Sequence, residues 1–475
     1  MSGAGRKPPD ASARGPNGRA RSPNAPDTTG WERPMSRAMR ADGAPATLED
    51  YVAAGGYEGL RRALTELRPE DVTKAVRDSG LRGRGGAGYS TGGKWSTMPL
   101  GPDAPHPKYV VCNGDEMEPG SFKDRYLLSR NPHLLIEGML VAAYAVQADD
   151  GFIFLRAQYD EPYASVERAL AEAAAAGYLG EHILGSDFSF ELFLHESVGR
   201  YICGEASAML NALESQRPNP RARPPHMTGA GLYARPTVVN NVETLCAVPS
   251  IVRNGADWWK GLSITAEGGT KIYGVAGRVQ RPGCVELPMG TSMRELIDVH
   301  AGGMQPGFKL RAVSPGGAST AFVPADQIDV AMDFSAVATA QSRMGTGTMV
   351  LLDDHTCPVG MTLNMLQFFA QESCGWCTPC REGLQWTALL LREIEEGRGT
   401  REDLDVLAEH VWFMGADKTF CDLAPGAMQP LEAALRLFRD DFVAHIESGR
   451  CPYAAAEADE SAGGGEPAGP EGDAG

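Results

Sequence analysis

Four cysteines have the spacing of an iron–sulfur ligand set. Cys374, Cys377 and Cys380 are separated by two residues each, and Cys421 follows further along the chain. Three thiolates at this spacing can bind one [4Fe–4S] cluster, and a remote fourth thiolate completes its coordination. Zinc is the alternative ion, but zinc sites more often use two separated cysteine pairs. The sequence therefore predicts that these four cysteines hold a [4Fe–4S] cluster.

The other six cysteines have no ligand spacing among themselves. Because no export signal precedes them, a disulfide framework is not expected. We expect small buried apolar thiols, as free cysteines commonly are. Among them, Cys203 has neighbours of functional type. The six are Cys112, Cys203, Cys246, Cys284, Cys357 and Cys451.

A glycine-rich loop at residues 83–88 satisfies the pattern G-x-G-x-x-G. The dinucleotide fingerprint needs a strand before such a loop, whereas residues 68–79 have a helical pattern, so a standard Rossmann motif is not expected. The glycines still let backbone N–H groups approach a phosphate closely. Arg82, Arg84 and Lys94 add positive charge nearby. The loop therefore predicts phosphate binding rather than simple flexibility.

The elements that position these motifs divide the chain into three structured regions. Residues 46–262 alternate strand and helix patterns, which indicates an α/β domain. Residues 263–348 carry short strands and one short helix, and residues 349–453 are helical. The expected strands lie at 109–112, 152–155, 188–195 and 271–277. The expected helices lie at 163–176, 292–299, 384–396, 402–414 and 427–447.

The two ends of the chain differ from these regions in composition. Residues 1–45 are rich in Pro, Gly, Ala and Arg and predict a disordered, mildly basic arm, and residues 454–475 predict a disordered acidic tail. The net charge of −17 argues against binding to a nucleic-acid backbone. No apolar run reaches the length of a membrane span, and no secretory signal is visible. We expect a cytoplasmic protein that reaches a membrane only through partners.

Three further segments occur with the loop and the cysteines: residues 112–120 (CNGDEMEPG), 201–205 (YICGE) and 239–244 (VNNVET). In this order, the five motifs resemble the flavoprotein subunit of bacterial complex I, the respiratory NADH:quinone oxidoreductase. The similarity runs from about Leu48 to Tyr453. It implies a multidomain α/β fold: a Rossmann-like FMN domain of unusual topology, a ubiquitin-like (β-grasp) insert of the soluble-ligand-binding type, and a C-terminal four-helix iron–sulfur domain.

The resemblance also implies site residues and a reaction. NADH would pass a hydride to FMN, and single electrons would follow to the cluster and on toward quinone. The catalytic residues would be Glu118, Tyr201 and Glu205. FMN would contact Gly83, Arg84, Gly85, Gly86, Gly88, Lys94, Asn113, Asp115, Glu116, Gly204, Val239, Asn240, Asn241 and Thr244. The nucleotide substrate would contact Tyr89, Lys94, Glu118, Tyr201, Ala206 and His226.

The sequence departs from the family at two nucleotide-binding positions. Relatives carry a second glutamate where this chain has Ala206, and that carboxylate contacts the adenosine ribose and repels a 2′-phosphate. Relatives also carry an aromatic residue where this chain has His226. The loss of the carboxylate removes a like-charge penalty against NADPH. We therefore expect relaxed discrimination between NADH and NADPH.

Three functional hypotheses follow from these features. The first is the respiratory subunit, with a thioredoxin-like [2Fe–2S] subunit and a large multi-cluster subunit as partners, on the cytoplasmic face of the inner membrane. The second is the diaphorase subunit of a soluble NAD-linked formate dehydrogenase or hydrogenase. The lack of cysteines in residues 1–111 argues against the fused cluster domains of those relatives. The third is a structural relay that keeps its cluster but does not oxidise NADH.

Overall fold

A computed structural model describes residues 30–454. Its first region contains a four-stranded parallel sheet with the strand order β3-β2-β1-β4. The central strand β1 is apolar and buried on both faces, as expected for a parallel strand covered by helices. The strands are β1 (Tyr109–Gly114), β2 (Asp150–Leu155), β3 (Glu191–Glu196) and β4 (Thr237–Asn241). The mixed α/β fold is thereby confirmed.

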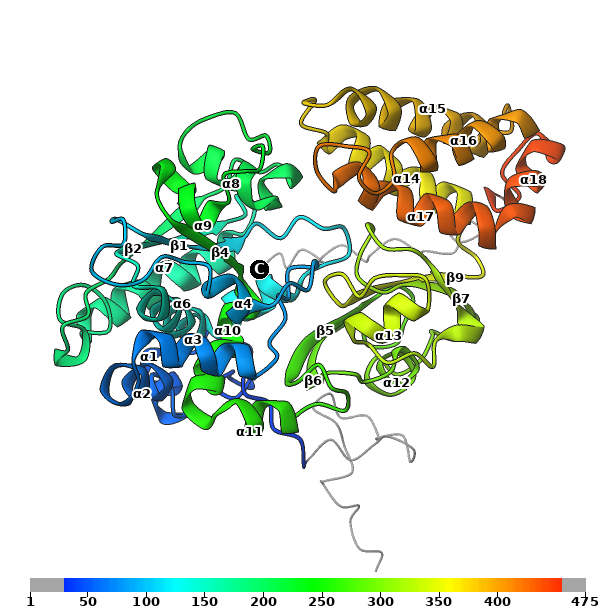
Figure 1. The fold of residues 1–475 in the computed structure, drawn as a ribbon. Helices are drawn as coiled ribbons and strands as arrows, with labels where there is room; N and C mark the ends of the chain where they lie inside the picture. Colours follow the sequence, from blue (N-terminus) through cyan, green and yellow to red (C-terminus); the bar gives the residue numbers. More distant parts are fainter. Residues whose placement is uncertain (1–29, 455–475) are drawn as a thin grey trace, which may run out of the picture.

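Helices surround this sheet (Figure 1). The helix α6 is almost entirely buried because it is apolar around its whole circumference. It packs closely against α10, and a Cβ at Gly138 would lie 2.2 Å from the Leu245 carbonyl oxygen. The helices are α1 (Leu48–Ala53), α2 (Glu58–Glu66), α3 (Pro69–Asp78), α4 (Thr91–Trp95), α5 (Lys123–Arg130), α6 (Pro132–Val146), α7 (Asp160–Ala175), α8 (Ala206–Leu213), α9 (Met227–Ala230), α10 (Val242–Asn254) and α11 (Ala256–Gly261).

A second, mixed sheet has the strand order β6-β5-β9-β7-β8 and its own apolar core. Only β5 and β9 pair in parallel; the other pairs are antiparallel. The expected helix at 292–299 is α12 (Met293–Glu295) followed by a wider helical turn, Leu296–His300. The other elements are β5 (Thr270–Ala276), β6 (Gly283–Pro288), β7 (Leu310–Ser314), β8 (Val323–Pro324), α13 (Phe334–Thr339) and β9 (Thr348–Asp353).

The last region is a separate helical layer next to the second sheet (Figure 1). The helix expected over 427–447 is in fact two helices that meet at Phe438. This residue leaves the helical conformation (φ −119°), and its side chain is buried, so the apolar pattern continues across the break. The helices are α14 (Pro358–Glu372), α15 (Leu384–Glu395), α16 (Arg401–Phe413), α17 (Leu423–Leu437) and α18 (Arg439–Ser448).

Buried charges join the first region to the second sheet. Lys271 of β5 places its Nζ 2.8 Å from Glu243 Oε2 of α10, and Lys123 Nζ of α5 lies 3.2 Å from the same oxygen. All three side chains are almost completely buried. Each charge therefore depends on the others, because an isolated charge in this interior would be costly.

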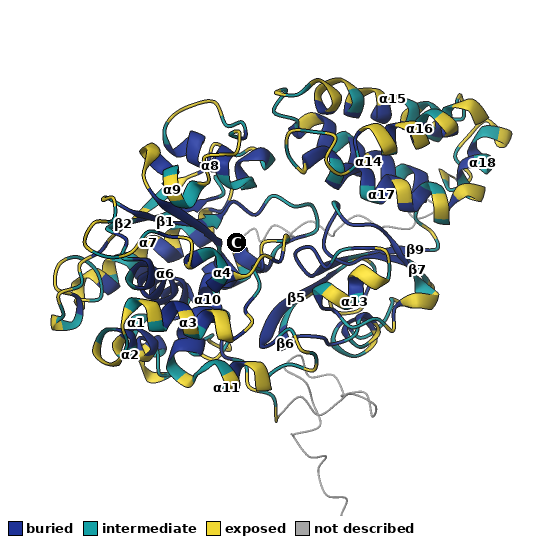
Figure 2. Cartoon of the chain, viewed as in Figure 1, coloured by how far each residue is buried: buried dark blue, intermediate teal, exposed yellow. Residues whose placement is uncertain are grey.

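Residues 30–45, which were expected to belong to a disordered arm, are part of the described structure. Met35 is fully buried, and the backbone N–H groups of Met35 and Ser36 donate to the carboxylate of Glu286 in β6, at 3.1 and 2.8 Å. This buried carboxylate needs donors, which residues 35 and 36 supply. Residues 1–29 of the expected arm, and 455–475 of the expected tail, lie outside the described residues. Figure 2 shows that the buried residues continue through all three regions.

Candidate functional site

A cavity of about 720 Å³ opens at the carboxyl edge of the parallel sheet. Ligands of open α/β sheets commonly bind at this edge. The strands β1 and β4 pair in parallel and bring the residues after both strands together. The cavity walls also include residues of the second sheet region and of the loop between α16 and α17. Three regions of the chain thus build one polar site.

The glycine loop forms one wall through Gly85, Gly86 and Ala87. A side chain would obstruct this wall, since a Cβ at Gly85 would lie 3.1 Å from Asn241 Cβ. Gly86 has a φ of +120°, a conformation that favours glycine. The exposed backbone therefore suits a bulky anionic group such as a phosphate.

The two arginines of this loop do not have the expected position. The Arg84 guanidinium is buried outside the cavity lining, with Nη1 3.1 Å from Met289 Sδ and Nη2 3.3 Å from the Thr270 carbonyl oxygen. Arg82 donates to the Gly88 carbonyl oxygen at 2.7 Å and pairs with Glu267 at 3.0 Å. Both side chains hold the loop against the second sheet region, Arg84 through Thr270 and Met289 and Arg82 through the Glu267 carboxylate. The backbone of the loop remains available to a phosphate.

Asp115 is the most unusual group in the cavity. It directly follows β1, and neither carboxylate oxygen has a hydrogen-bond partner among the described residues. Burial raises the pKa of this carboxyl group to about 7. A buried polar atom without a partner is costly and commonly marks a ligand site. Asp115 therefore fits a ligand with hydrogen-bond donors, such as the ring or the hydroxylated chain of a flavin.

The neighbours of Asp115 are held by the protein itself. The Asn113 amide donates to the Gly204 carbonyl oxygen at 2.9 Å, which fixes both residues in the wall. The Glu116 carboxylate accepts from Ser121 Oγ at 2.7 Å and from the backbone N–H groups of Asp124 and Arg125 at 3.1 and 3.0 Å. Glu116 thus satisfies the first N–H groups of α5. Its main interactions are structural, although it also lines the cavity.

Glu118 and Tyr201 form a hydrogen-bonded pair on another wall. The Tyr201 hydroxyl donates to Glu118 Oε2 at 2.7 Å, and the Ser319 N–H donates to Oε1 at 2.6 Å. Burial raises the pKa of Glu118. Tyr201 lies in the short helical turn Tyr201–Gly204 and packs edge-on against Phe368 of α14. The pair therefore joins all three regions at the cavity.

Glu205 lines the cavity and caps α8. Its Oε2 accepts from the Ala208 N–H at 2.8 Å, which satisfies a free donor at the helix start. Its Oε1 lies 2.9 Å from Arg223 Nη2, which also lines the cavity. The pair places opposite charges at the cavity mouth, where both side chains are partly exposed.

Several expected contact residues lie behind or beside the cavity lining. Lys94 donates to the Val239 carbonyl oxygen at 2.9 Å, and burial lowers its pKa. Asn240 accepts from Trp95 Nε1 at 2.9 Å. Tyr89 and His226 are exposed. The expected residues outside the lining are Gly83, Arg84, Gly88, Tyr89, Lys94, Ala206, His226, Val239, Asn240 and Thr244. The expected residues that line the cavity are Gly85, Gly86, Asn113, Asp115, Glu116, Glu118, Tyr201, Gly204, Glu205 and Asn241.

Four basic residues of the lining were missed in the sequence: Lys123, Arg221, Arg223 and Arg343. Lys123 Nζ lies 2.7 Å from Asp124 Oδ1 and 3.2 Å from Asn241 Oδ1. Its position just after the 112–120 motif could have marked it. Arg343 donates to the Ser319 carbonyl oxygen at 2.6 Å, and no local signal distinguishes it from other surface-type arginines.

The four predicted cluster ligands line one small pocket: Cys374, Cys377, Cys380 and Cys421. Three of them come from the connection between α14 and α15, and the fourth from the loop between α16 and α17. Arg217 donates to the Cys374 carbonyl oxygen at 2.7 Å and holds this connection. Four thiols around one pocket fit the ligand set of a [4Fe–4S] cluster.

The thiol pocket adjoins the polar cavity. Cys421 lines both, as do Ile202, Pro220, Phe420 and Leu423. A group in the cavity and a metal cluster on the thiols would therefore be separated only by a shared wall of side chains. This short separation suits electron transfer.

Family models match three parts of the chain. They are the Nuo51 FMN-binding domain at residues 76–250, the SLBB domain at 272–323 and the NADH-ubiquinone oxidoreductase-F iron–sulfur binding region at 360–445. These matches identify FMN and an iron–sulfur cluster as cofactors. The fold and the two adjoining sites are those of an iron–sulfur flavoprotein.

Curated relatives show to which family of iron–sulfur flavoproteins the chain belongs. The F subunit of NADH-quinone oxidoreductase of Escherichia coli is 48% identical over 414 residues, which cover 87% of this chain and 93% of the relative. The F 2 subunit of the same enzyme of Rhizobium meliloti is 49% identical over 86% of this chain and 96% of its own length. The chain belongs to the family of NADH-quinone oxidoreductase F subunits. The resemblance drawn from the motifs is confirmed.

A solved structure supports the same arrangement. A chain of an NAD⁺-reducing [NiFe]-hydrogenase superposes with a TM-score of 0.73 at 35% identity, covering 86% of this chain and 67% of that chain. Among residues 30–454, each helix is too short or too polar to span a bilayer.

Proposed function

We propose that the chain is the NADH-oxidising, electron-entry subunit of an NADH:quinone oxidoreductase. One observation carries the proposal: the polar cavity and the four-thiol pocket share a wall that contains Cys421. Bound FMN supplies the chemistry that links two-electron oxidation of NADH to single-electron transfer. The residues of this chain bind, orient and enclose the reactants, which is the task that a protein performs for a redox cofactor.

The proposed flavin-binding residues have distinct tasks. The N–H groups of the glycine loop bind the phosphate, and Asn241 closes the same wall. Asp115 supplies acceptors for the donors of the flavin. Asn113 and Gly204 keep the wall in place through their mutual hydrogen bond. Glu116 lines the same wall, and Lys94, Val239, Asn240 and Thr244 support it from behind.

Of the proposed nucleotide-binding residues, Glu118 and Tyr201 line the cavity, whereas Tyr89, Lys94, Ala206 and His226 lie outside its lining. Glu118 and Tyr201 orient the nicotinamide, since their hydrogen bond fixes both side chains. Glu205 holds a negative charge near the mouth, and Tyr89, Lys94, Ala206 and His226 contact the rest of the nucleotide. Orientation of the two reactants can supply several kcal/mol of the barrier, by the effective-molarity argument (roughly 7–11 kcal/mol).

The three regions are proposed to act as domains. Residues 46–262 bind FMN and NADH in a Rossmann-like domain of unusual topology, 263–348 form a ubiquitin-like domain, and 349–453 form a four-helix [4Fe–4S] domain. Each region contributes to the cavity or to the cluster pocket. The strand β9 (Thr348–Asp353) pairs with β5 and β7, which favours a boundary after Asp353 between the second and third domains.

The chain is a subunit of a larger complex, and its proposed partners are a thioredoxin-like [2Fe–2S] subunit and a large multi-cluster iron–sulfur subunit. Large exposed side chains on the helical region support a surface that partners cover; they are Trp376, Trp386, Leu389, Trp412, Phe413 and Phe420. The proposed place is the cytoplasmic face of the membrane, reached through these partners.

The second candidate is the diaphorase subunit of a soluble NAD-linked hydrogenase. The superposition on the NAD⁺-reducing hydrogenase chain favours it. The higher identity to the quinone-linked relatives favours the first proposal. A third candidate, a relay without NADH oxidation, rests on Ala206 and His226.

Steady-state oxidation of NADH and NADPH tests these candidates. The flavin- and cluster-loaded chain is purified with its small [2Fe–2S] partner, and ferricyanide serves as the acceptor. NADH oxidation is the expected result. No turnover of either nucleotide, with flavin and iron demonstrably bound, would favour the relay instead.

A further inference from the structure

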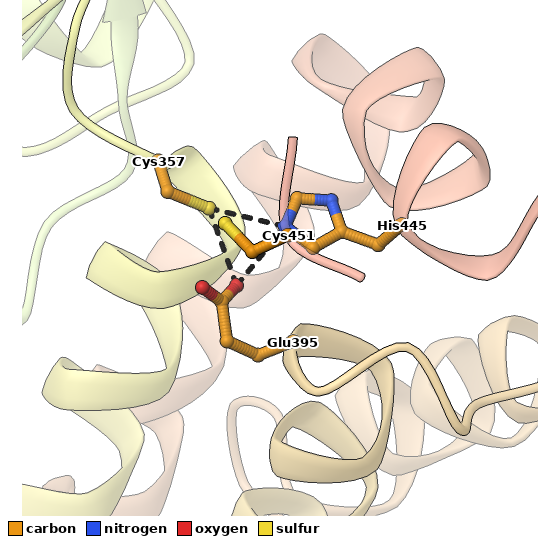
Figure 3. Close-up of side chains that lie close together, drawn as sticks. All are labelled: Cys357, Glu395, His445 and Cys451. Carbon is orange, nitrogen blue, oxygen red and sulfur yellow. Dashed lines mark hydrogen bonds and ion pairs between the residues drawn. The ribbon is translucent and has the colours of Figure 1, made fainter. Parts of the chain in front are cut away.

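A second group of metal-ligand side chains lies in the helical region, apart from the four cluster cysteines. Cys357, Glu395, His445 and Cys451 point toward one another (Figure 3), and their ligand atoms all lie within 4.8 Å of one another. We propose that these four residues bind a structural zinc ion. The proposal does not depend on the electron-entry function.

The distances within the group match a tetrahedral ion. Cys357 Sγ lies 3.2 Å from Glu395 Oε2 and 3.3 Å from His445 Nε2, and these two atoms are 3.2 Å apart. Zinc binds sulfur at about 2.3 Å and nitrogen or oxygen at about 2.0–2.2 Å, which sets its ligand atoms roughly 3.3–3.8 Å apart. Three of the four ligand atoms are therefore close to tetrahedral spacing already, and Cys451 Sγ lies within 4.8 Å of each of them.

The histidine is already oriented for coordination. Its Nδ1 lies 2.7 Å from the Asp441 carbonyl oxygen, which accepts the Nδ1–H. This hydrogen bond leaves Nε2 facing Cys357 Sγ and Glu395 Oε2, and metal binding would displace any proton that Nε2 carries. A histidine ligand of zinc typically donates its other ring N–H to such an acceptor.

Cys357 is also placed to bind as a thiolate. It is the N-cap of α14, and the Gly360 N–H donates to its Sγ at 3.2 Å. Helix N-termini favour negative charge. On binding, the thiols of Cys357 and Cys451 each release a proton, and the two thiolates and the Glu395 carboxylate coordinate the cation.

The four ligands come from four places in the chain. Cys357 precedes α14, Glu395 ends α15, His445 lies in α18 and Cys451 follows α18. Cys357 and His445 are buried, and the other two are partly buried. Four protein ligands are typical of structural zinc sites, whereas catalytic sites keep a position open. The ion would connect the segment after α18 to the start of α14 and the end of α15.

The ligand set favours zinc among common ions. Two sulfurs with imidazole exclude magnesium and calcium, which prefer oxygen ligands. This group revises the expectation that Cys357 and Cys451 are only small buried hydrophobes. Their separation in the sequence concealed the set, because no ligand spacing connects them.

The test uses the full chain with its flavin and iron–sulfur cluster, purified under reducing conditions after growth with zinc. Elemental analysis should find one zinc per chain in addition to the cluster iron. X-ray absorption at the zinc edge should show two sulfur ligands and two nitrogen or oxygen ligands. Zinc misplaced on the cluster cysteines would instead show four sulfurs, and this would overturn the proposal.

Variants separate this site from the rest of the chain. Cys451→Ser and His445→Gln should lose zinc to a chelator while retaining flavin and iron. Loss of an outer-sphere partner alone costs about 10- to 100-fold in metal affinity, so loss of a ligand should cost at least as much. Cys284→Ser, at a cysteine outside both groups, and Cys377→Ser, in the cluster set, should keep their zinc. Wild-type protein without zinc, or a Cys357–Cys451 disulfide found by mass spectrometry, would contradict the proposal.

Discussion

Ala206 begins α8 directly after the Glu205 carboxylate, which is paired with Arg223 and with the helix start. Ala206→Glu adds a second carboxylate at this position. A hydrogen bond to a charged group is worth about 1.5–3 kcal/mol, so we expect the ratio of kcat/KM for NADH to that for NADPH to rise about 10- to 100-fold. Steady-state kinetics with both nucleotides measure this ratio.

The variant Ala206→Gln is the matched control, because glutamine has the shape of glutamate. It can donate and accept hydrogen bonds but adds no negative charge, so it should raise NADH affinity without excluding NADPH. An unchanged nucleotide ratio in Ala206→Glu would refute the assignment of Ala206 to specificity.

Asp115 makes stability depend on pH. Its pKa is about 7 in the fold against 3.8 for an ordinary aspartate, so between these values the folded chain binds more protons than the unfolded chain. Stability is therefore lost as pH rises through this window. Asp115→Asn removes the titration, and the variant should gain about 2–3 kcal/mol relative to wild type between pH 5 and 8. Urea unfolding of flavin-free protein measures the difference.

The control for this titration is Asp103→Asn, which removes an exposed carboxylate. Its stability relative to wild type should change little over the same range. A difference between wild type and Asp115→Asn that stays constant with pH would show that Asp115 does not titrate there.

Gly138 sets the distance between α6 and α10. Because its added Cβ would meet the Leu245 carbonyl oxygen at 2.2 Å, Gly138→Ala must push the helices apart. Overpacking of this kind costs about 1–3 kcal/mol. We expect a lower midpoint of thermal unfolding for this variant.

Gly261→Ala, at the end of α11, is the control because no heavy atom lies within 4 Å of its added Cβ. Alanine stabilises helices relative to glycine by roughly 0.5–1 kcal/mol, so this variant should be neutral or slightly stabilised. Equal effects of the two substitutions would contradict the packing argument.

Elements with a strong local pattern were predictable from the sequence. The apolar runs at β1 and β2 gave their positions, and α15 and α16 lie within one or two residues of the expected helices. The break between α17 and α18 was not predictable, since buried Phe438 fits the apolar spacing of one long helix. The ordered residues 35 and 36 depend on Glu286, about 250 positions away, and no local pattern reports such a contact.

For the candidate site too, local motifs were predictable from the sequence, and contacts between distant regions were not. Its local motifs, the glycine loop and the cysteine cluster, identified two walls and the cluster pocket. The side chain of Arg84 turned away because acceptors from the second sheet region surround it. Arg343 and Ser319 entered the cavity through packing between distant regions, which a single sequence does not encode locally.

The buried charges around Glu243 hold the first region against the second sheet. Glu243→Gln leaves Lys271 without its partner and Lys123 with only part of its own. Breaking a buried pair in this way costs about 3–5 kcal/mol. We expect a large decrease in the urea midpoint of the whole chain.

The double variant Glu243→Gln/Lys271→Met removes the unpaired charge as well. Lys123 keeps Asp124 at 2.7 Å, so much of the lost stability should return, since apolar replacements of buried pairs are often tolerated. If the double variant is no more stable than the single variant, the charges do not interact as described.

The shared wall at Cys421 also has a consequence for biosynthesis. Gly85 and Gly86 leave the ribosome more than 300 residues before Cys421. At roughly 5–20 residues per second, this interval is on the order of half a minute. The flavin cavity is therefore incomplete throughout most of translation, and its last wall arrives together with the final cluster ligand. Flavin enclosure and cluster insertion are thus late events in the maturation of the same chain.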